Sequence, residues 1–334
     1  MNSFISIFKK KLNFKKFIIL YFILTTSVFL VYPYFVYRLY SHPSHGLAWI
    51  QNSYRKKEAI AKSIKGKKIV FVSGSNTLFG VRTQDIQSAI GIPVVNLGVD
   101  IALGPDYILE RSKRSLRSGD TVILPLEYKF YMFDGDREQT EIDYVLTLDK
   151  PFLQKLSFLD RVRFLDSVEP MEIFLSLGRR KLPPETPVGN GFSSKTLNSN
   201  GDETDNFDQK IILDNIKKKY KPVPIQRIQP YYESFGLREV VKYKEWCDRN
   251  NINMVITWPS TIYFGVYKDL SYREYFSFLI SFFKAHHISV LGSPYDFFYP
   301  INYFYNSIYH LNSMGMTIRT NKLIDLLRRA DVGK

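Results

Sequence analysis

The segment KIVFVSGSNTLFGVRTQDIQSAIGIPVVNL occupies residues 68–97 and contains one strand–helix–strand cycle. Residues 68–72 (KIVFV) form a short, continuous apolar run of the kind found in buried strands, and a Gly/Ser turn follows it. Residues 83–90 then have a helical pattern, and residues 93–97 (PVVNL) return to an apolar run. Strands that are buried on both faces and alternate with helices are typical of a parallel sheet in an α/β layer fold.

The same alternation continues on the C-terminal side and resumes after a long interruption. A helix is expected at 105–116 and a strand at 121–126, and the rhythm returns with helices at 237–249, 272–286 and about 316–329 and strands at 253–257 and 288–291. The interruption contains an amphipathic piece at 151–165 and a polar run at 183–209, which we expect to be a long, mobile loop. We therefore predict one α/β domain over residues 67–333 with an insertion at about 134–235.

Composition and charge exclude several classes of protein. The chain has 334 residues, of which 45% are hydrophobic, so it is neither disordered nor a coiled coil. Its single cysteine, Cys247, cannot form an internal disulfide or a thiolate metal site by itself. The net charge of +14 includes five lysines in the first 16 residues, and the rest of the chain has 41 basic and 32 acidic residues without a long basic run. We expect no nucleic-acid partner.

The clearest physical signal is an uncharged run of 21 residues at 17–37, FIILYFILTTSVFLVYPYFVY, which is long enough to cross about 30 Å of hydrocarbon as a helix. Basic residues precede it in the segment 1–16, and only Arg38 follows closely. The sequence thus predicts a single-pass anchor in the cytoplasmic membrane, with the N-terminus in the cytoplasm and the domain on the periplasmic or extracellular side. Residues 46–66 are expected to form a linking helix.

Two other interpretations of residues 17–37 remain open. The run could belong to a cleaved signal peptide or to a buried core helix. The apolar run exceeds a normal signal-peptide core, and YRLYSHPSHG follows it in place of a small-x-small cleavage site. These features favour an uncleaved anchor.

The turns after the strands are where ligands bind in open α/β sheets. Residues 73–77 (SGSNT) follow the first expected strand, residues 96–100 (NLGVD) follow the second, and residues 309–312 (YHLN) precede the last helix. A hydroxyl on the first turn, a glycine backbone on the second and a histidine on the last can supply a nucleophile, an oxyanion donor and a base.

These blocks, in this order, resemble the SGNH or GDSL hydrolase superfamily, in particular its membrane-anchored branch found near bacterial cell-envelope and polysaccharide functions. FVSGSNTLFG resembles the first block, with Ser75 at the nucleophile position, and NLG resembles the second, with Gly98 beside the Ser75 amide as oxyanion donor. His310 stands at the base position. The resemblance covers 68–128 and 300–325. It implies a flavodoxin-like, three-layer parallel sheet and an esterase or acyltransferase for O-acyl groups, most simply acetyl, of an envelope or secreted glycan.

The sequence departs from this family pattern at two places. The acid expected three or four residues before the histidine is replaced by Ser307 or Asn306, so these two are the candidates that orient the ring without supplying charge. The oxyanion asparagine of the third block has no clear match in LPLEY, residues 124–128. Glu127 and Asp100 stand at strand ends and are alternative orienters, although such carboxylates are more often solvated or capping groups.

Simpler interpretations compete with each assignment. Ser75 can be a turn residue, His310 a structural histidine, and Gly98 a residue needed only for a positive φ angle. A catalytically degenerate SGNH-like domain that binds glycan or acts as a scaffold in envelope assembly is therefore the main alternative, and a basic protein that binds anionic lipid or polymer is a third. We expect no metal and no cofactor, since His286 and His287 diverge on a helix and no nucleotide-binding motif occurs. The sequence does not indicate an oligomeric state.

Overall fold

The computed structural model of the chain describes residues 14–44, 46–179, 182, 184–185, 192–205, 220–227 and 230–331, and for residues 24–30 it describes the backbone alone. The chain divides into two compact units. The N-terminal unit comprises residues 14–44 and 142–179, and the sheet unit comprises residues 46–141 and the described residues from 182 onward.

A five-stranded sheet forms the centre of the sheet unit. Its strands are β1 (Ile69–Phe71), β2 (Val94–Asn96), β3 (Thr121–Leu124), β4 (Asn253–Ile256) and β6 (Ser289–Val290). They lie in the order β2-β1-β3-β4-β6, and each neighbouring pair is parallel. Counted along the chain, this is the order 2-1-3-4-5 of a common class of doubly wound sheets, in which ligands bind beyond the carboxyl ends of the strands. The predicted parallel α/β sheet is confirmed.

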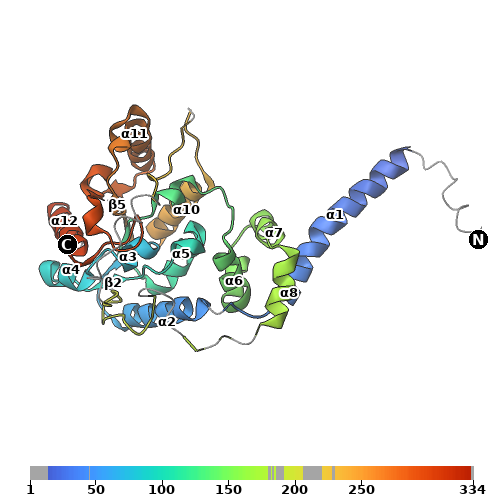
Figure 1. Cartoon of the computed structure of the whole chain (residues 1–334), viewed down its shortest axis with the longest axis horizontal. Coiled ribbons are helices and arrows are strands. Elements are labelled where there is room, and N and C mark those ends of the chain that lie inside the picture. Colours follow the sequence, from blue (N-terminus) through green and yellow to red (C-terminus); the bar gives the residue numbers. More distant parts are fainter. Residues whose placement is uncertain are drawn as a thin grey trace, which may run out of the picture. The chain divides into compact units, whose positions relative to one another are not determined.

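Helices surround this sheet. The helices among the described residues of the sheet unit are α2 (Leu47–Ser63), α3 (Ser75–Leu78), α4 (Thr83–Ile90), α5 (Pro105–Ser112), α10 (Phe235–Arg249), α11 (Leu270–Ala285) and α12 (Ser313–Arg329). α5 packs on α10, and α4 packs on α12 (Figure 1). Every residue of β1, β2 and β3 is buried, so both faces of the sheet are covered, as a three-layer α/β fold requires.

Short elements complete the sheet unit near its C-terminus and between the helices. A separate parallel pair is formed by β5 (Thr261–Ile262) and β7 (Phe298–Tyr299). The 3-10 helices are η2 (Ile101–Leu103), η3 (Lys113–Ser115), η4 (Tyr128–Met132), η6 (Gly265–Lys268), η7 (Pro294–Phe297) and η8 (Ile301–Tyr303). η8 and β7 precede the turn that contains His310.

The polar run of the insertion differs from its expected loop where it is described. Asn200 accepts from the Asn96 amide and donates through Nδ2 to the Val94 carbonyl, so this segment follows the edge of β2. Asp202 binds the Thr83 hydroxyl and the Gln84 amide at the start of α4. Residues 192–205 are therefore packed against the sheet unit because their polar side chains satisfy backbone groups. Residues 183, 186–191 and 206–209 of the predicted loop lie outside the described residues.

The N-terminal unit contains α1 (Phe14–Leu39), η5 (Lys150–Gln154), α7 (Phe158–Asp166), α8 (Pro170–Gly178) and most of α6 (Gln139–Leu148). α1 packs on α7 and α8. The Tyr32 hydroxyl donates to the Val168 carbonyl between those two helices, and the Tyr40 hydroxyl donates to Asp143, which also pairs with Arg179. The helical part of the insertion thus belongs with α1.

The predicted membrane segment, 17–37, lies within α1. In the part of the chain whose side chains are described, which omits residues 24–30 of this helix, no helix has the length and apolar character needed to cross a membrane. The anchor stays a prediction from the sequence.

Candidate active site

Ser75 is the first residue of α3, directly after the turn that follows β1. Its Oγ lies 2.8 Å from Nε2 of His310, although 235 residues separate the two in sequence. Both side chains are almost covered, at 5% and 7% exposure. The structure therefore brings together the two residues that the sequence predicts as nucleophile and base.

The other ring nitrogen of His310 determines which tautomer is present. Nδ1 lies 2.7 Å from Oδ1 of Asn306, which can only accept a hydrogen bond, so Nδ1 carries the proton. Nε2 is then unprotonated and accepts from the Ser75 hydroxyl. This is the tautomer that a general base needs.

Burial sets the charge state of the imidazole. The ring packs against Phe79 at a centroid distance of 4.5 Å and against Phe192 at 6.1 Å. Burial lowers the pKa of His310 to about 3, and no carboxylate among the described residues offsets this effect. His310 is therefore neutral at ordinary pH and can accept a proton, but within the described part of the chain the resulting imidazolium has Asn306, and no carboxylate, to stabilise it.

Of the two predicted orienters, Asn306 contacts the ring and Ser307 does not. Ser307 Oγ instead accepts from the amides of Tyr309 and His310 and so shapes the turn. Tyr220 donates its hydroxyl hydrogen to the Asn306 carbonyl. The contact with Tyr220 fixes the backbone of Asn306, and the Asn306 side chain faces the imidazole.

Backbone hydrogen bonds fix the His310 turn on the nucleophile turn. The Leu311 amide donates to the Phe79 carbonyl at 3.1 Å, just after α3, and the Tyr305 amide donates to the His310 carbonyl at 2.8 Å. Asn312 caps α12 by accepting from the Gly315 amide. The dyad distance is therefore set by one backbone contact between the two turns and by a second one within the His310 turn.

Glu127 is buried and lies under the nucleophile turn, away from the position of an orienter. It follows β3 and accepts from Ser73 Oγ at 2.6 Å and from the amides of Gly74 and Asn76 at 3.2 and 3.1 Å. These amides flank Ser75, whose own amide has no acceptor among the described residues. The Ser75 amide is thus available as an oxyanion donor.

Asp100, the other carboxylate weighed as an orienter, caps η2. Its Oδ1 accepts from the Ala102 amide at 2.8 Å, and burial raises the pKa of its carboxyl group. Neither Asp100 nor Glu127 hydrogen bonds to His310. Both carboxylates act as acceptors for backbone amides at strand ends.

Gly98 lies against the nucleophile turn, but its amide is already paired. It donates to Asn96 Oδ1 at 2.9 Å, and the buried Lys57 donates to the Gly98 carbonyl at 2.8 Å. Gly98 is not among the described glycines with positive φ, so the positive-φ interpretation is wrong. A Cβ there would lie 2.7 Å from the Leu78 amide nitrogen and 2.8 Å from the Gly74 carbonyl, so glycine is needed for close backbone approach.

Arg319 is fully buried on α12 and holds the nucleophile turn from the other side. Nη1 donates to the Asn76 carbonyl at 2.8 Å, and Nη2 donates to Asn76 Oδ1 at 2.9 Å. Burial lowers the pKa of this guanidinium to about 10. The residue after Ser75 is therefore bound by a buried carboxylate and by a buried guanidinium.

Sequence reasoning missed several of these supporting residues. Arg319 and Lys57 look like ordinary helix charges, and Phe192 lies in the polar insertion. The local signal for the two charges is helical spacing, because Lys57 shares a helix face with Tyr54 and Ala61, and Arg319 shares one with Met316 and Leu323. Phe192 is an isolated apolar residue in a polar stretch. Glu127 binds backbone amides and Ser73 in place of the predicted histidine, because a carboxylate after a strand can accept from either kind of donor.

The described residues contain no group of three or more His, Cys, Asp or Glu side chains placed to hold a metal ion. Cys247 is buried in α10, and burial raises the pKa of its thiol to about 12. Comparison of the chain with protein-family models and with curated proteins found no match.

Proposed function

We propose that the chain is a membrane-anchored, SGNH-like esterase or acyltransferase that acts on O-acyl groups of an envelope or secreted glycan. The observation that carries the proposal is the hydrogen-bonded series from Ser75 Oγ through the His310 ring to Asn306 Oδ1. It lies beyond the carboxyl ends of β1 and β2 in a parallel sheet, where sites of this fold class occur. The finer assignment to an SGNH-type three-layer fold is part of the proposal.

The chemistry follows from the tautomer. His310 Nε2 takes the hydroxyl proton as Ser75 Oγ attacks the acyl carbonyl, and the Ser75 amide binds the oxyanion. Collapse of the tetrahedral intermediate breaks the bond to the glycan oxygen, which takes the proton from His310. Water or an acceptor hydroxyl then attacks the acyl-enzyme, with His310 again as base. Hydrolysis and transfer differ only in this second nucleophile.

The substrate class rests on the resemblance of FVSGSNTLFG, NLG and His310 to the SGNH superfamily. A small acyl group suits a nucleophile that is 5% exposed and whose base, His310, packs against the Phe79 ring. No cofactor or metal has a step in this mechanism. A glycan or another acylated molecule is the proposed partner.

Labelling with a fluorophosphonate tests the nucleophile. The full chain in detergent should acquire one label, and Ser75→Ala should lose it. Ser88→Ala is the control that should keep the label, because Ser88 is exposed on α4 and its hydroxyl only donates to the Gln84 carbonyl of the same helix. His310→Ala should slow labelling strongly, and the Ser75→Ala/His310→Ala pair should be no worse than Ser75→Ala for acyl turnover, because the residues act as one unit. Labelling that persists in Ser75→Ala would refute the nucleophile.

A second candidate function, a degenerate domain that binds glycan or serves as a scaffold, is favoured by specific observations. His310 has no carboxylate partner among the described residues, and the Gly98 amide already donates to Asn96. If a deletion phenotype is rescued by the chain carrying both Ser75→Ala and His310→Ala, this alternative holds. If this doubly substituted chain folds but does not rescue the phenotype, the enzyme holds.

The proposed location is the cytoplasmic membrane, with one crossing by residues 17–37 and the sheet unit outside. Support comes from the 21 uncharged residues and from the lysines that precede them. Protease added to spheroplasts should digest the chain after Tyr37 and spare residues 1–16. Protection of the sheet unit until lysis would refute the orientation, and release by carbonate would refute the anchor.

A further inference from the structure

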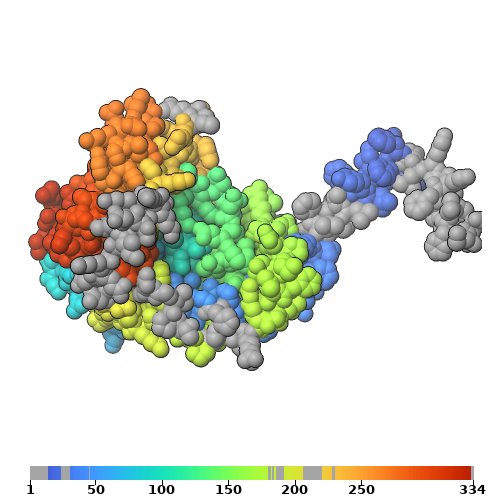
Figure 2. All heavy atoms as spheres, viewed as in Figure 1, coloured from blue at the N-terminus to red at the C-terminus, as the bar shows by residue number. Residues whose placement is uncertain are grey.

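The N-terminal unit exposes an unusual amount of apolar surface on two short helices. Phe158 and Leu159 of α7 are 70% and 56% exposed, and Phe174 of α8 is 69% exposed. Met171, Leu175 and Leu177 of α8 are also about half exposed or more. Figure 2 shows α7 and α8, in yellow-green, at the surface of the molecule. Single exposed apolar residues are normal in soluble proteins, but six within residues 158–177 indicate a binding surface.

We propose that this surface, called here the α7–α8 face, docks into the outer interface of the membrane that α1 crosses. This inference rests on the anchor in the proposed function and adds a second contact with the same bilayer. The binding partner of the α7–α8 face is lipid of the outer leaflet, at the boundary between headgroups and acyl chains.

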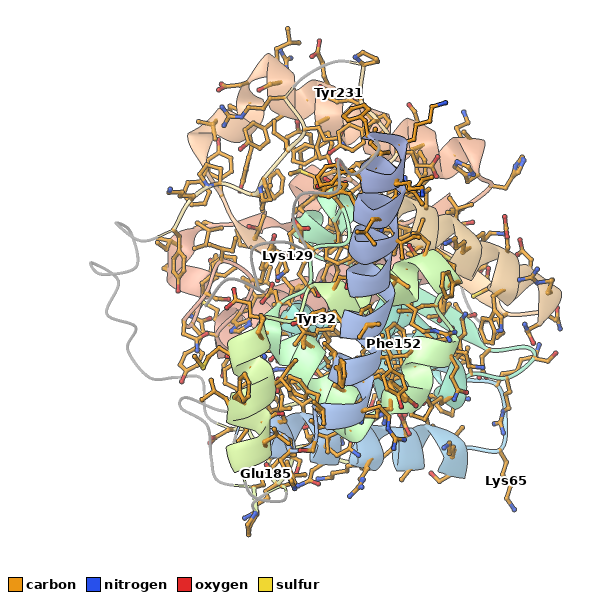
Figure 3. All side chains as sticks on the ribbon, turned by 90° about the vertical axis from the view of Figure 1, so that its right-hand side faces the viewer. Tyr32, Lys65, Lys129, Phe152, Glu185 and Tyr231 are labelled. Atoms are coloured by element: carbon orange, nitrogen blue, oxygen red, sulfur yellow. The ribbon has the colours of Figure 1, made fainter. Side chains whose placement is uncertain are left out.

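Hydrogen bonds to α1 determine the depth of this face relative to the proposed span. Tyr32, labelled on α1 in Figure 3, donates its hydroxyl hydrogen to the Val168 carbonyl in the link between α7 and α8. Tyr32 precedes Tyr37, the outer end of the span, by five residues, or about 7.5 Å along a helix. Amphipathic helices that lie in a bilayer interface bury their apolar side about 5–10 Å into it. The α7–α8 link is therefore at interfacial depth.

A cation marks the headgroup level at the end of α1. Lys150 donates to the carbonyls of Tyr37 and Tyr40 at 3.1 and 3.2 Å, and its ammonium lies 5.3 Å from the centre of the Tyr37 ring. Lysine, arginine and tyrosine concentrate where a membrane helix leaves the hydrocarbon. The level of Lys150 and the depth of Val168 thus agree with one membrane boundary.

A mainly apolar cavity of about 310 Å³, whose lining also includes Gln154 and Arg161, lies at the same level of α1. Pro33, Tyr34 and Tyr37 line it on one side, and Leu153, Phe158 and Leu165 line it on the other. In water such a cavity would expose aromatic surface, whereas in an outer leaflet an acyl chain can fill it. Phe158 belongs to both the cavity and the α7–α8 face.

A lipid-quenching experiment with the full chain tests the proposal. Cys247 is fully buried, so a cysteine introduced on the surface is the reactive site for a polarity-sensitive fluorophore. The label is placed at Phe174→Cys, at Phe22→Cys on α1, and at the exposed Lys242→Cys on α10 as a control. Each chain is reconstituted into phosphatidylcholine–phosphatidylglycerol vesicles that contain lipids with a shallow nitroxide.

We expect blue-shifted emission and strong quenching at residues 22 and 174, and neither at residue 242. If residue 22 is quenched while residue 174 behaves like residue 242, the docking proposal fails and the anchor stands. If neither 22 nor 174 is quenched, the anchor fails and the docking proposal fails with it. As a second readout, the Phe174→Glu/Leu175→Glu pair should weaken quenching at a label on Met171→Cys without changing that at Phe22→Cys, and unchanged quenching would overturn the proposal.

Discussion

Arg319 binds the residue after the nucleophile through two hydrogen bonds, to the backbone oxygen and the side-chain oxygen of Asn76. The guanidinium fork fits these two acceptors, and a lysine ammonium at this distance would satisfy only one of them well. We predict that Arg319→Lys lowers the free energy of unfolding by about 1–3 kcal/mol, the cost of a buried acceptor left unpaired. It should also slow fluorophosphonate labelling of Ser75.

Arg328→Lys is the matched control, since Arg328 is on the same helix and its guanidinium donates to the Ala89 carbonyl near the surface. Urea unfolding and fluorophosphonate labelling rates measured on both variants test the two predictions for Arg319→Lys. A normal labelling rate in Arg319→Lys would show that Arg319 supports the fold without positioning Ser75.

Asn306 occupies the position at which an acid would stabilise the His310 imidazolium. Asn306→Asp should therefore raise acyl turnover by roughly tenfold or more, because the opposite change in a serine protease triad costs about 10⁴ in kcat. The new carboxylate should also raise the pKa of His310, so the acid limb of the pH–rate profile should move to higher pH.

Asn302→Asp adds the same charge to an exposed neighbour of this turn and should change neither property. Turnover that stays the same or falls in Asn306→Asp, with its fold intact by circular dichroism, would contradict the assigned role of Asn306.

Most strands and helices of the sheet unit could be predicted because each is determined by a local pattern, whereas α6, α8 and the β5–β7 pair are not among the predicted elements. The helices expected at 83–90 and 237–249 are observed at Thr83–Ile90 and Phe235–Arg249, and the strand expected at 253–257 is observed at Asn253–Ile256. The last helix begins at Ser313, three residues earlier than expected, because Asn312 caps it through the Gly315 amide. Such caps determine helix ends more sharply than hydrophobic spacing does.

The dyad could be predicted because Ser75 and His310 stand in recognisable turns, but the residues that hold them could not. Arg319 reaches Asn76 across 243 positions of sequence, and no local pattern indicates that pairing. The packing of residues 192–205 could not be predicted for a different reason. Its composition predicts an unpacked loop, yet the carbonyl and the side-chain amide of Asn200 bond to the backbone of β2 where an edge strand has no neighbouring strand.

Burial of His310 also predicts a pH dependence of stability. The folded-state pKa is about 3 and the ordinary value is 6.5, so between them the unfolded chain binds a proton that the folded chain does not. Stability should therefore rise as the pH increases from about 4 to 6.5, and His310→Gln should flatten this rise. Urea midpoints across this range test the prediction, with His286→Gln as control. An equally steep rise in His310→Gln would contradict it.

Gly98 allows the loop after β2 to touch the nucleophile turn. Gly98→Ala places a methyl group 2.7 Å from the Leu78 amide nitrogen, so we predict a loss of about 1–3 kcal/mol of stability from overpacking and much slower labelling of Ser75. Gly265→Ala is the control because no atom beyond its chain neighbours lies within 4 Å of the place that a Cβ would take there. A normal labelling rate in Gly98→Ala would show that the loop after β2 shifts to make room for the methyl group without moving Ser75.

Glu127 gives the most direct test of whether the contacts under the nucleophile turn position Ser75 or only stabilise the fold. Its two oxygens accept from Ser73 and from the amides of Gly74 and Asn76. Glu127→Gln keeps the shape but places an NH₂ group against one of these donors, which should cost about 1–3 kcal/mol of stability. Because both amides flank Ser75, labelling should slow more than the loss of stability alone explains.

Glu138→Gln is the control, because Glu138 forms a half-exposed surface pair with Lys129, and it should leave both the stability and the labelling rate unchanged. Labelling is best measured well below the urea midpoint of each variant, so that unfolding does not contribute. A Glu127→Gln protein that is destabilised but labels at the normal rate would mean that Glu127 supports the fold and leaves the position of Ser75 to Arg319 and Gly98.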